Sequence, residues 1–91
     1  MLKLWGKIIR GHRTIKNVTV EDPLADWDVL ERVKICLDDM IMDLDLPRPI
    51  WFEQNEKDIY NFGRTEFHQD HFIEPIDFHH LEIEIIEIEE D

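Results

Sequence analysis

The C-terminal segment LEIEIIEIEED, residues 81–91, alternates apolar and acidic residues with the period of two that a half-buried β-strand requires. Three of its apolar residues, up to Ile85, share one parity, and two, from Ile86 onward, take the other. A β-bulge at Ile85-Ile86 would return all five apolar side chains to one face. The segment therefore predicts a bulged strand whose opposite face carries Glu82, Glu84, Glu87 and Glu89.

The distribution of charge indicates which strand can pair with this acidic face. Residues 1–20 hold five basic residues and no acidic one, whereas residues 21–91 hold 22 acidic and five basic residues. In the segment LKLWGKII, residues 2–9, Lys3 and Lys7 lie on the face opposite most of its aliphatic side chains. Cross-strand pairs of opposite charge stabilise a sheet by about 0.2–1 kcal/mol each, and like charges destabilise it. We therefore predict that the last strand pairs with the first.

A hairpin is expected before the first helix. The turn RGHR, residues 10–13, separates the first strand from TIKNVTVE, residues 14–21, which is rich in β-branched residues. Asp22-Pro23 or Asp26 can then cap the start of a helix.

A long helix follows the hairpin. Its apolar residues between positions 29 and 44 fall within an arc of about 140°, which predicts a broad side facing the core. Cys36 lies inside this arc, so we interpret it as a buried hydrophobe rather than a reactive thiol. The helix is expected to end before Pro47.

The remaining segments predict a short second helix and little else. This helix begins near NEKD, residues 55–58, and ends at Gly63. A short strand near residues 64–67 and one helical turn near residues 69–72 are indicated only weakly. Residues 1–91 are thus expected to form one α+β domain: a β-hairpin, a long helix, a short second helix and a C-terminal strand in a sheet of order 2-1-3. A right-handed crossover would set the last strand antiparallel to the first.

Charge and cysteine content exclude several classes of function. The formal net charge is -12, and because phosphate contacts need Lys and Arg, we expect no nucleic-acid binding and no anionic membrane partner. Cys36 is the only cysteine, so neither an internal disulfide nor a thiolate zinc site is expected. Charged residues interrupt the N-terminal segment, and no apolar run has the length of a signal peptide or a membrane span. We therefore place the protein in the cytoplasm.

Three stretches resemble a family of small acidic proteins from anaerobic Gram-positive bacteria. They are LKLWGKII, the central LPRPIWFEQNEKDIYNFGRTEFHQDHFIEPIDF and the terminal LEIEII. This resemblance covers most of the chain. That family has no assigned function, so the resemblance implies no activity, cofactor or catalytic residue.

Histidine is the one residue type whose clustering has chemical content. Four of the five histidines lie between positions 68 and 80. His68 and His71 share a face if a helical turn forms there, and His79 or His80 could complete a site for zinc or another divalent ion. As neighbours on a strand these last two would point to opposite faces, so at most one could join. The candidate ligands are His68, Asp70, His71 and His79.

The histidine spacing is nevertheless a weak motif. HxxH without a glutamate base is not the HExxH of metalloproteases. Solvated loop histidines are the simpler interpretation, so we expect no resident cofactor and no zinc binding tighter than micromolar.

The sequence favours a small interaction module over an enzyme. The chain contains no serine, which excludes serine nucleophile motifs. The candidate surface for a protein partner or for a second copy of the chain comprises Trp5, Ile35, Met42 and Leu46. Trp5 lies on the outer face of the sheet and the other three on the back of the long helix, unless the second helix covers them. The alternatives are a metal-binding protein built on the histidines and an acidic mimic of nucleic acid.

Overall fold

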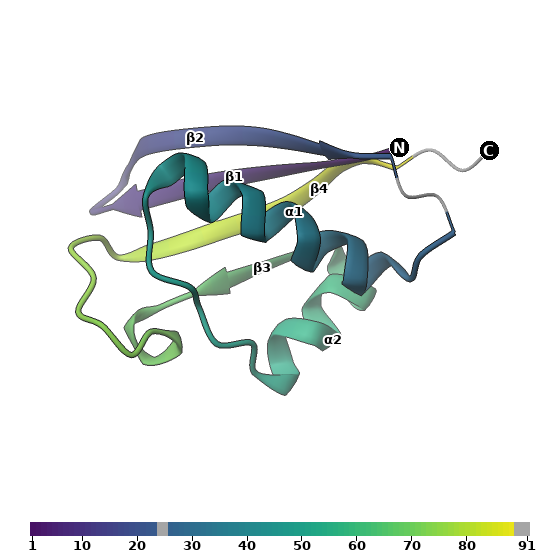
Figure 1. Ribbon diagram of the computed structural model, residues 1–91. Helices are drawn as coiled ribbons and strands as arrows, with labels where there is room; N and C mark the ends of the chain where they lie inside the picture. Colours follow the sequence, from purple (N-terminus) through teal and green to yellow (C-terminus); the bar gives the residue numbers. More distant parts are fainter. Residues whose placement is uncertain (24–25, 89–91) are drawn as a thin grey trace.

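The computed structural model describes residues 1–23 and 26–88, and its centre is a four-stranded antiparallel β-sheet (Figure 1). The strands lie in the order β2-β1-β4-β3. Their bounds are β1 Leu2–Arg10, β2 Arg13–Asp22, β3 Arg64–Phe67 and β4 His80–Ile88. The protein is therefore α+β, and its last strand pairs with its first, as predicted; the two strands are antiparallel. The predicted order 2-1-3 is wrong, because β3 adds a fourth strand beyond β4.

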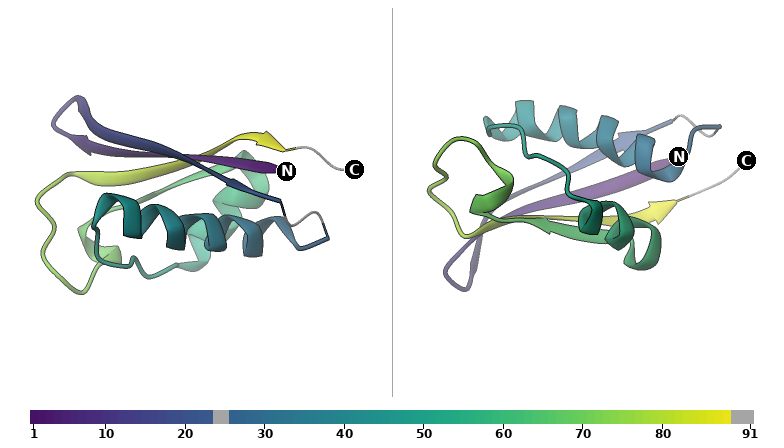
Figure 2. Two further views of the ribbon diagram at one scale, coloured as in Figure 1. Left: turned by 45° about the horizontal axis from the view of Figure 1, so that its top comes forward. Right: turned by 90° about the horizontal axis from the view of Figure 1, so that it is seen from below.

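Two helices pack against this sheet. The helix α1, Val29–Leu44, packs on β1 and β2, and α2, Glu53–Phe62, packs beside β3 (Figure 2). A short 3-10 turn, Gln69–His71, follows β3. Gly6 on β1 lets α1 approach closely, since a Cβ at this position would lie 2.0 Å from the Met40 sulfur. Among the described helices, none is long and apolar enough to cross a membrane.

The bulge predicted in the last strand is present in the β1–β4 pairing. Leu4 pairs with Ile85 and Lys3 with Glu87, so Ile86 is the extra residue. Leu81 and Ile83 are completely buried, but Ile86 and Ile88 are 48% and 45% exposed. The bulge thus restores the register of the charges, whereas the two isoleucines after Ile85 are only half covered. Glu89, which we expected on the acidic face, lies outside the described residues.

The expected charge pairs connect β1 with β4. Lys7 Nζ lies 2.7 Å from a carboxylate oxygen of Glu82, and Lys3 Nζ lies 3.1 Å from one of Glu87. The hydrogen bond to Glu87 is the main cause of the raised pKa of Lys3. Complementary charge therefore lies at the positions that fix the register of the terminal strands.

Reversing the Lys7 charge should weaken this pairing. We expect Lys7→Glu to lower the free energy of unfolding by about 0.5–2 kcal/mol at low ionic strength, because one cross-strand attraction becomes a repulsion. Salt should reduce the loss. Lys57→Glu is the matched control, since Lys57 pairs with Glu53 on the exposed side of α2. Urea denaturation at two salt concentrations measures the stability of both variants. Equal denaturation midpoints for wild type and Lys7→Glu at low salt would contradict a stabilising Lys7–Glu82 pair.

The long helix begins later than either predicted cap. Asp28 is the N-cap, and its side chain accepts a hydrogen bond from the amide of Leu30 at 3.1 Å. Neither Asp22 nor Asp26 caps the helix: Asp22 is the last residue of β2, and its carboxylate binds the buried Arg32 at 3.2 Å. Cys36 is buried as expected, and burial is the main cause that raises the pKa of its thiol to about 11.

The second helix has the predicted end. Gly63 closes α2 in the left-handed conformation, with φ of 70°. The helix begins at Glu53, where the Asn55 side chain accepts a hydrogen bond from the Phe52 amide at 2.8 Å. Ile59 is the residue through which α2 enters the hydrophobic core.

Candidate functional site

A polar network fixes β3 against α2. The Asn55 side-chain amide donates to the Thr65 hydroxyl at 2.9 Å and to the Glu66 carbonyl at 3.0 Å. The Thr65 hydroxyl in turn donates to an Asp58 carboxylate oxygen at 3.0 Å. Asn55 and Thr65 are both 3% exposed. This short strand is therefore held on both sides, by β4 and by α2, which gives its outward side chains defined positions.

Two pairs of polar side chains meet across β3 and β4. Glu66 pairs with Glu82 in the antiparallel register, His68 follows Glu66 by two residues, and His80 precedes Glu82 by two. Residues two apart on a strand point to the same face. An E-x-H segment of one strand consequently lies opposite an H-x-E segment of the other.

His79 brings a third imidazole to the same place. It directly precedes β4, and its amide donates to the carbonyl of Ile9 at 2.8 Å. Nitrogen atoms of His68, His79 and His80 all lie within 4.8 Å of one another. The Nδ1 atoms of His79 and His80 are 2.7 Å apart. The expectation that only one of these two neighbours could join a site is wrong, because His79 lies outside the regular strand.

Glu66 contacts two of the three imidazoles. Its two carboxylate oxygens lie 3.2 Å from Nε2 of His68 and 3.5 Å from Nε2 of His80. A carboxylate acceptor favours the Nε2–H tautomer, which leaves Nδ1 with the lone pair. Carboxylates hold metal-ligating histidines in this manner in many proteins. The three histidines together with Glu66 are called the His cluster below.

The surroundings of His80 favour its neutral imidazole. Burial is the main cause that lowers the pKa of His80; Glu66 acts in the opposite direction, and nearby His68 and His79 lower the pKa further. Glu82 is within reach of His80, and the two form a second potential metal-ligand group with Glu66. However, Glu82 is already paired with Lys7. The imidazole nitrogens are thus the stronger ligand candidates.

His71 and Asp70 do not join the His cluster. His71 is 8% exposed and accepts a hydrogen bond from the His68 amide at Nδ1, 3.0 Å away. Its ring stacks on Phe52 at a centroid distance of 4.1 Å and meets Phe67 edge-on at 5.5 Å. Asp70 lies 3.1 Å from the same nitrogen with its side chain 71% exposed. His71 therefore has a structural role beside β3.

Glu66 was absent from the candidates that the sequence supplied, and His80 entered only as the alternative to His79. The pattern that identifies them is the spacing of two in Glu66/His68 and in His80/Glu82. This spacing becomes informative only when the two segments are known to pair, because many surface residues are spaced by two. The antiparallel pairing of β3 with β4 shows that the two segments lie next to each other.

The candidate partner residues on the long helix do not form a continuous stripe. Met42 is 80% exposed, whereas Ile35 is half-buried and Leu46 packs against the hydrophobic core. The helix ends before Leu46, because Asp45 adopts a left-handed conformation and the Leu46 amide bonds back to the Ile41 carbonyl at 3.1 Å. This helix ending turns the chain inward. Leu46 therefore does not belong to the back of the helix.

Trp5 is partly covered by its neighbours on the outer face of the sheet. The Lys7 ammonium lies 4.1 Å from the centre of its ring, and its Nε1 donates to Asn17 at 3.4 Å. Trp5 thus contributes to the packing of the sheet surface. Nothing in these contacts distinguishes a partner site from an ordinary half-buried tryptophan.

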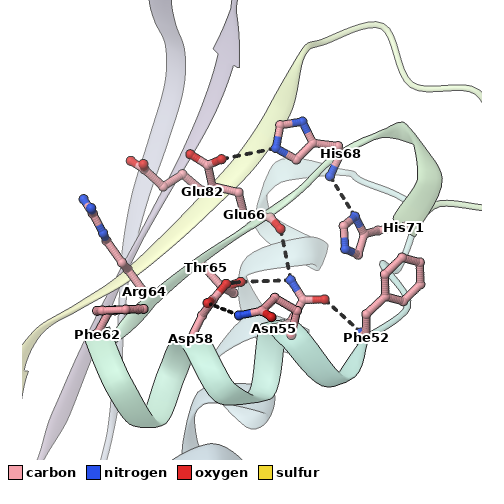
Figure 3. Close-up of a pocket in the computed structure, with 11 residues that line it drawn as sticks. Phe52, Asn55, Asp58, Phe62, Arg64, Thr65, Glu66, His68, His71 and Glu82 are labelled. Carbon is pink, nitrogen blue, oxygen red and sulfur yellow. Dashed lines mark hydrogen bonds and ion pairs between the residues drawn. The ribbon is translucent and has the colours of Figure 1, made fainter.

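A pocket of about 530 Å³ opens beside the His cluster, between α2 and β3 (Figure 3). Its walls include Phe52 and Phe62 from the two ends of α2 and Arg64 at the start of β3. Glu66 and His68 line the pocket and also belong to the His cluster. The candidate site therefore combines possible metal ligands with space for a small molecule.

Comparisons of the chain with protein-family models, with curated proteins and with solved structures give no match. The function must therefore be argued from the geometry of the site itself.

Proposed function

We propose that this protein binds a divalent transition-metal ion, with Zn²⁺ as the first candidate, through His68, His79 and His80. The observation that carries the proposal is the convergence of three imidazoles from two segments of the chain. Imidazole ligands suit zinc, copper, nickel and iron, and they select against calcium and magnesium. Zinc sites with three protein ligands keep a fourth position for water or another molecule.

The spacing of the His cluster is close to what a tetrahedral ion requires. Zinc–nitrogen bonds of about 2.0–2.1 Å imply nitrogen–nitrogen distances of about 3.3 Å in a tetrahedral site. The cluster brackets this value, with 2.7 Å between two Nδ1 atoms and an upper limit of 4.8 Å for all pairs. The imidazole rings would have to rotate to bring all three nitrogens to this distance, while Glu66 contacts two of the ligands.

The metal proposal is tested by calorimetric titration with Zn²⁺. We expect one equivalent to bind with a Kd of about 1 μM or below, which corresponds to about -8 kcal/mol. Glu66→Gln should weaken binding by about 10–100-fold, because it changes a group that orients two ligands. His80→Gln should weaken binding more than Glu66→Gln, because it removes a ligand.

The matched control is His12→Gln. His12 is the one histidine outside the segment 68–80 and is exposed in the β1–β2 turn. The His12→Gln substitution should leave both the affinity for Zn²⁺ and the stoichiometry unchanged. The same Kd for wild type and for His80→Gln, with both proteins folded by circular dichroism, would refute the site.

We further propose that the protein acts by binding rather than catalysis, and in the cytoplasm. Two observations argue against covalent catalysis by a serine or a cysteine: the chain has no serine, and its single thiol, Cys36, is buried and therefore unsuited to attack a substrate. A partner-binding role has less support, because the candidate residues on α1 are discontinuous. Sedimentation of the wild type at high concentration distinguishes a monomer from the homodimer that the sequence allowed.

A further inference from the structure

The pocket and the His cluster share a wall. Glu66, His68 and Glu82 line the pocket and also belong to potential metal-ligand groups. The pocket volume of about 530 Å³ lies in the range of about 300–1,000 Å³ typical of small-molecule sites. A metal ion at the cluster would therefore present its open coordination position at or near the space between α2 and β3.

Arg64 is the cationic side chain at the other end of the pocket. It lies four residues before His68, next to Phe62, and Figure 3 shows it away from His68. Within residues 1–23 and 26–88, no carboxylate forms an ion pair with it, although Glu84 is its cross-strand neighbour. An exposed guanidinium without an ion-pair partner favours a bidentate carboxylate ligand.

The carboxylates of the pocket already have partners. Glu82 pairs with Lys7, Glu66 contacts two histidines, and Asp58 accepts hydrogen bonds from Thr65 and from Gln54. One arginine and three carboxylates line the pocket, so its formal charge is negative, and Lys7 offsets only one of these charges. A divalent ion adds two positive charges, which brings the formal charge of the lining residues from -2 to 0. Anions should therefore bind more weakly to the metal-free pocket than to the metal-loaded one.

Two exposed aromatic rings stand at the two ends of the pocket. Phe62 is 70% exposed and Phe52 is 39% exposed, one at each end of α2. The stretch between them is lined by polar side chains, among them Asn55, Asp58 and Thr65 (Figure 3). A ligand bound at Arg64 can therefore cover the neighbouring Phe62 ring while it meets polar groups along the pocket.

From these contacts we infer that the pocket binds a small dicarboxylate, one carboxylate on the metal ion and the other on Arg64. This inference rests on the proposed metal site and adds the class of ligand. The dependence on metal follows from the two positive charges that the ion adds, and the preference for two carboxylates follows from the two separate cationic ends.

The test compares adipate with hexanoate, which has the same number of carbons but one carboxylate. Zinc-loaded protein, freed of excess metal, is titrated with each compound by calorimetry. We expect adipate to bind about tenfold or more tightly than hexanoate, the effect of one charge-assisted contact. Arg64→Gln should reduce this ratio to near one. The exposed Arg48, whose side chain is 73% accessible, provides the matched control Arg48→Gln, which should keep the ratio.

The outcomes separate the ligand inference from the metal proposal. Failure to bind zinc appears before any carboxylate is added, and it removes the proposed function together with the ligand inference. Zinc binding with equal affinities for adipate and hexanoate, or with a ratio unchanged in Arg64→Gln, overturns the ligand inference alone. Equal binding of adipate to zinc-free protein overturns the role of the metal in the pocket.

Discussion

Replacing Arg32 with alanine is expected to lower the free energy of unfolding by about 3–5 kcal/mol. A loss of this size can leave a large fraction of the molecules of a small domain unfolded. Arg32 on α1 is 2% exposed, and its Nε lies 3.2 Å from a carboxylate oxygen of Asp22, which is 3% exposed. The substitution would leave the Asp22 charge buried without this cation. Removing one partner of a buried ion pair is costly because the other loses its compensation out of water.

The Arg32 prediction has a matched control at the protein surface. Arg48 also pairs with an aspartate, Asp38, but both side chains are largely exposed. Surface pairs contribute about 0–1 kcal/mol, so Arg48→Ala should have little effect. Urea denaturation followed by tryptophan fluorescence measures both variants. A loss below 1 kcal/mol for Arg32→Ala would show that the pair is not buried in solution.

Replacing Phe67 with alanine should have an effect of similar size, about 3–5 kcal/mol, because it removes a large side chain from the core. Phe67 is completely buried and meets the ring of Trp51 edge-on at a centroid distance of 5.1 Å. It is also the residue between Glu66 and His68. Its loss should therefore destabilise β3 and weaken zinc binding as well.

Phe62→Ala is the matched control for Phe67→Ala. Phe62 is 70% exposed, so the same truncation should change stability by no more than about 0.5 kcal/mol. Thermal unfolding followed by circular dichroism, with and without zinc, measures both effects. Equal losses in the two variants would contradict the inclusion of β3 in the core.

The pairing of the chain ends could be predicted from the sequence because two independent patterns agreed. The apolar alternation located the bulge at Ile85-Ile86, and the lysines of β1 selected the partner for the acidic strand. Both patterns repeat over many residues, so a single residue that departs from them does not change the predicted pairing. Gly63 was equally informative, since a left-handed helix end has few alternatives to glycine.

The short strand at residues 64–67 was indicated by the sequence, but its place in the sheet and the His cluster were beyond prediction for a related reason. Four residues are too few to show a period, and β3 is held by the network around Asn55 and Thr65, which no local pattern reveals. The ligand set depends on that strand, because Glu66 and His68 are placed by it. The same limit applies to Arg32, whose position on the core side of α1 is acceptable only with Asp22 next to it.

X-ray absorption spectroscopy of the protein loaded with one equivalent of Zn²⁺ tests the central proposal most directly. The coordination shell should contain about three nitrogen ligands at about 2.0–2.1 Å, with the outer-shell scattering of imidazole rings. The imidazole scattering should decrease in His80→Gln and remain in His12→Gln. A shell made only of oxygen ligands, without imidazole scattering, would contradict metal binding by His68, His79 and His80.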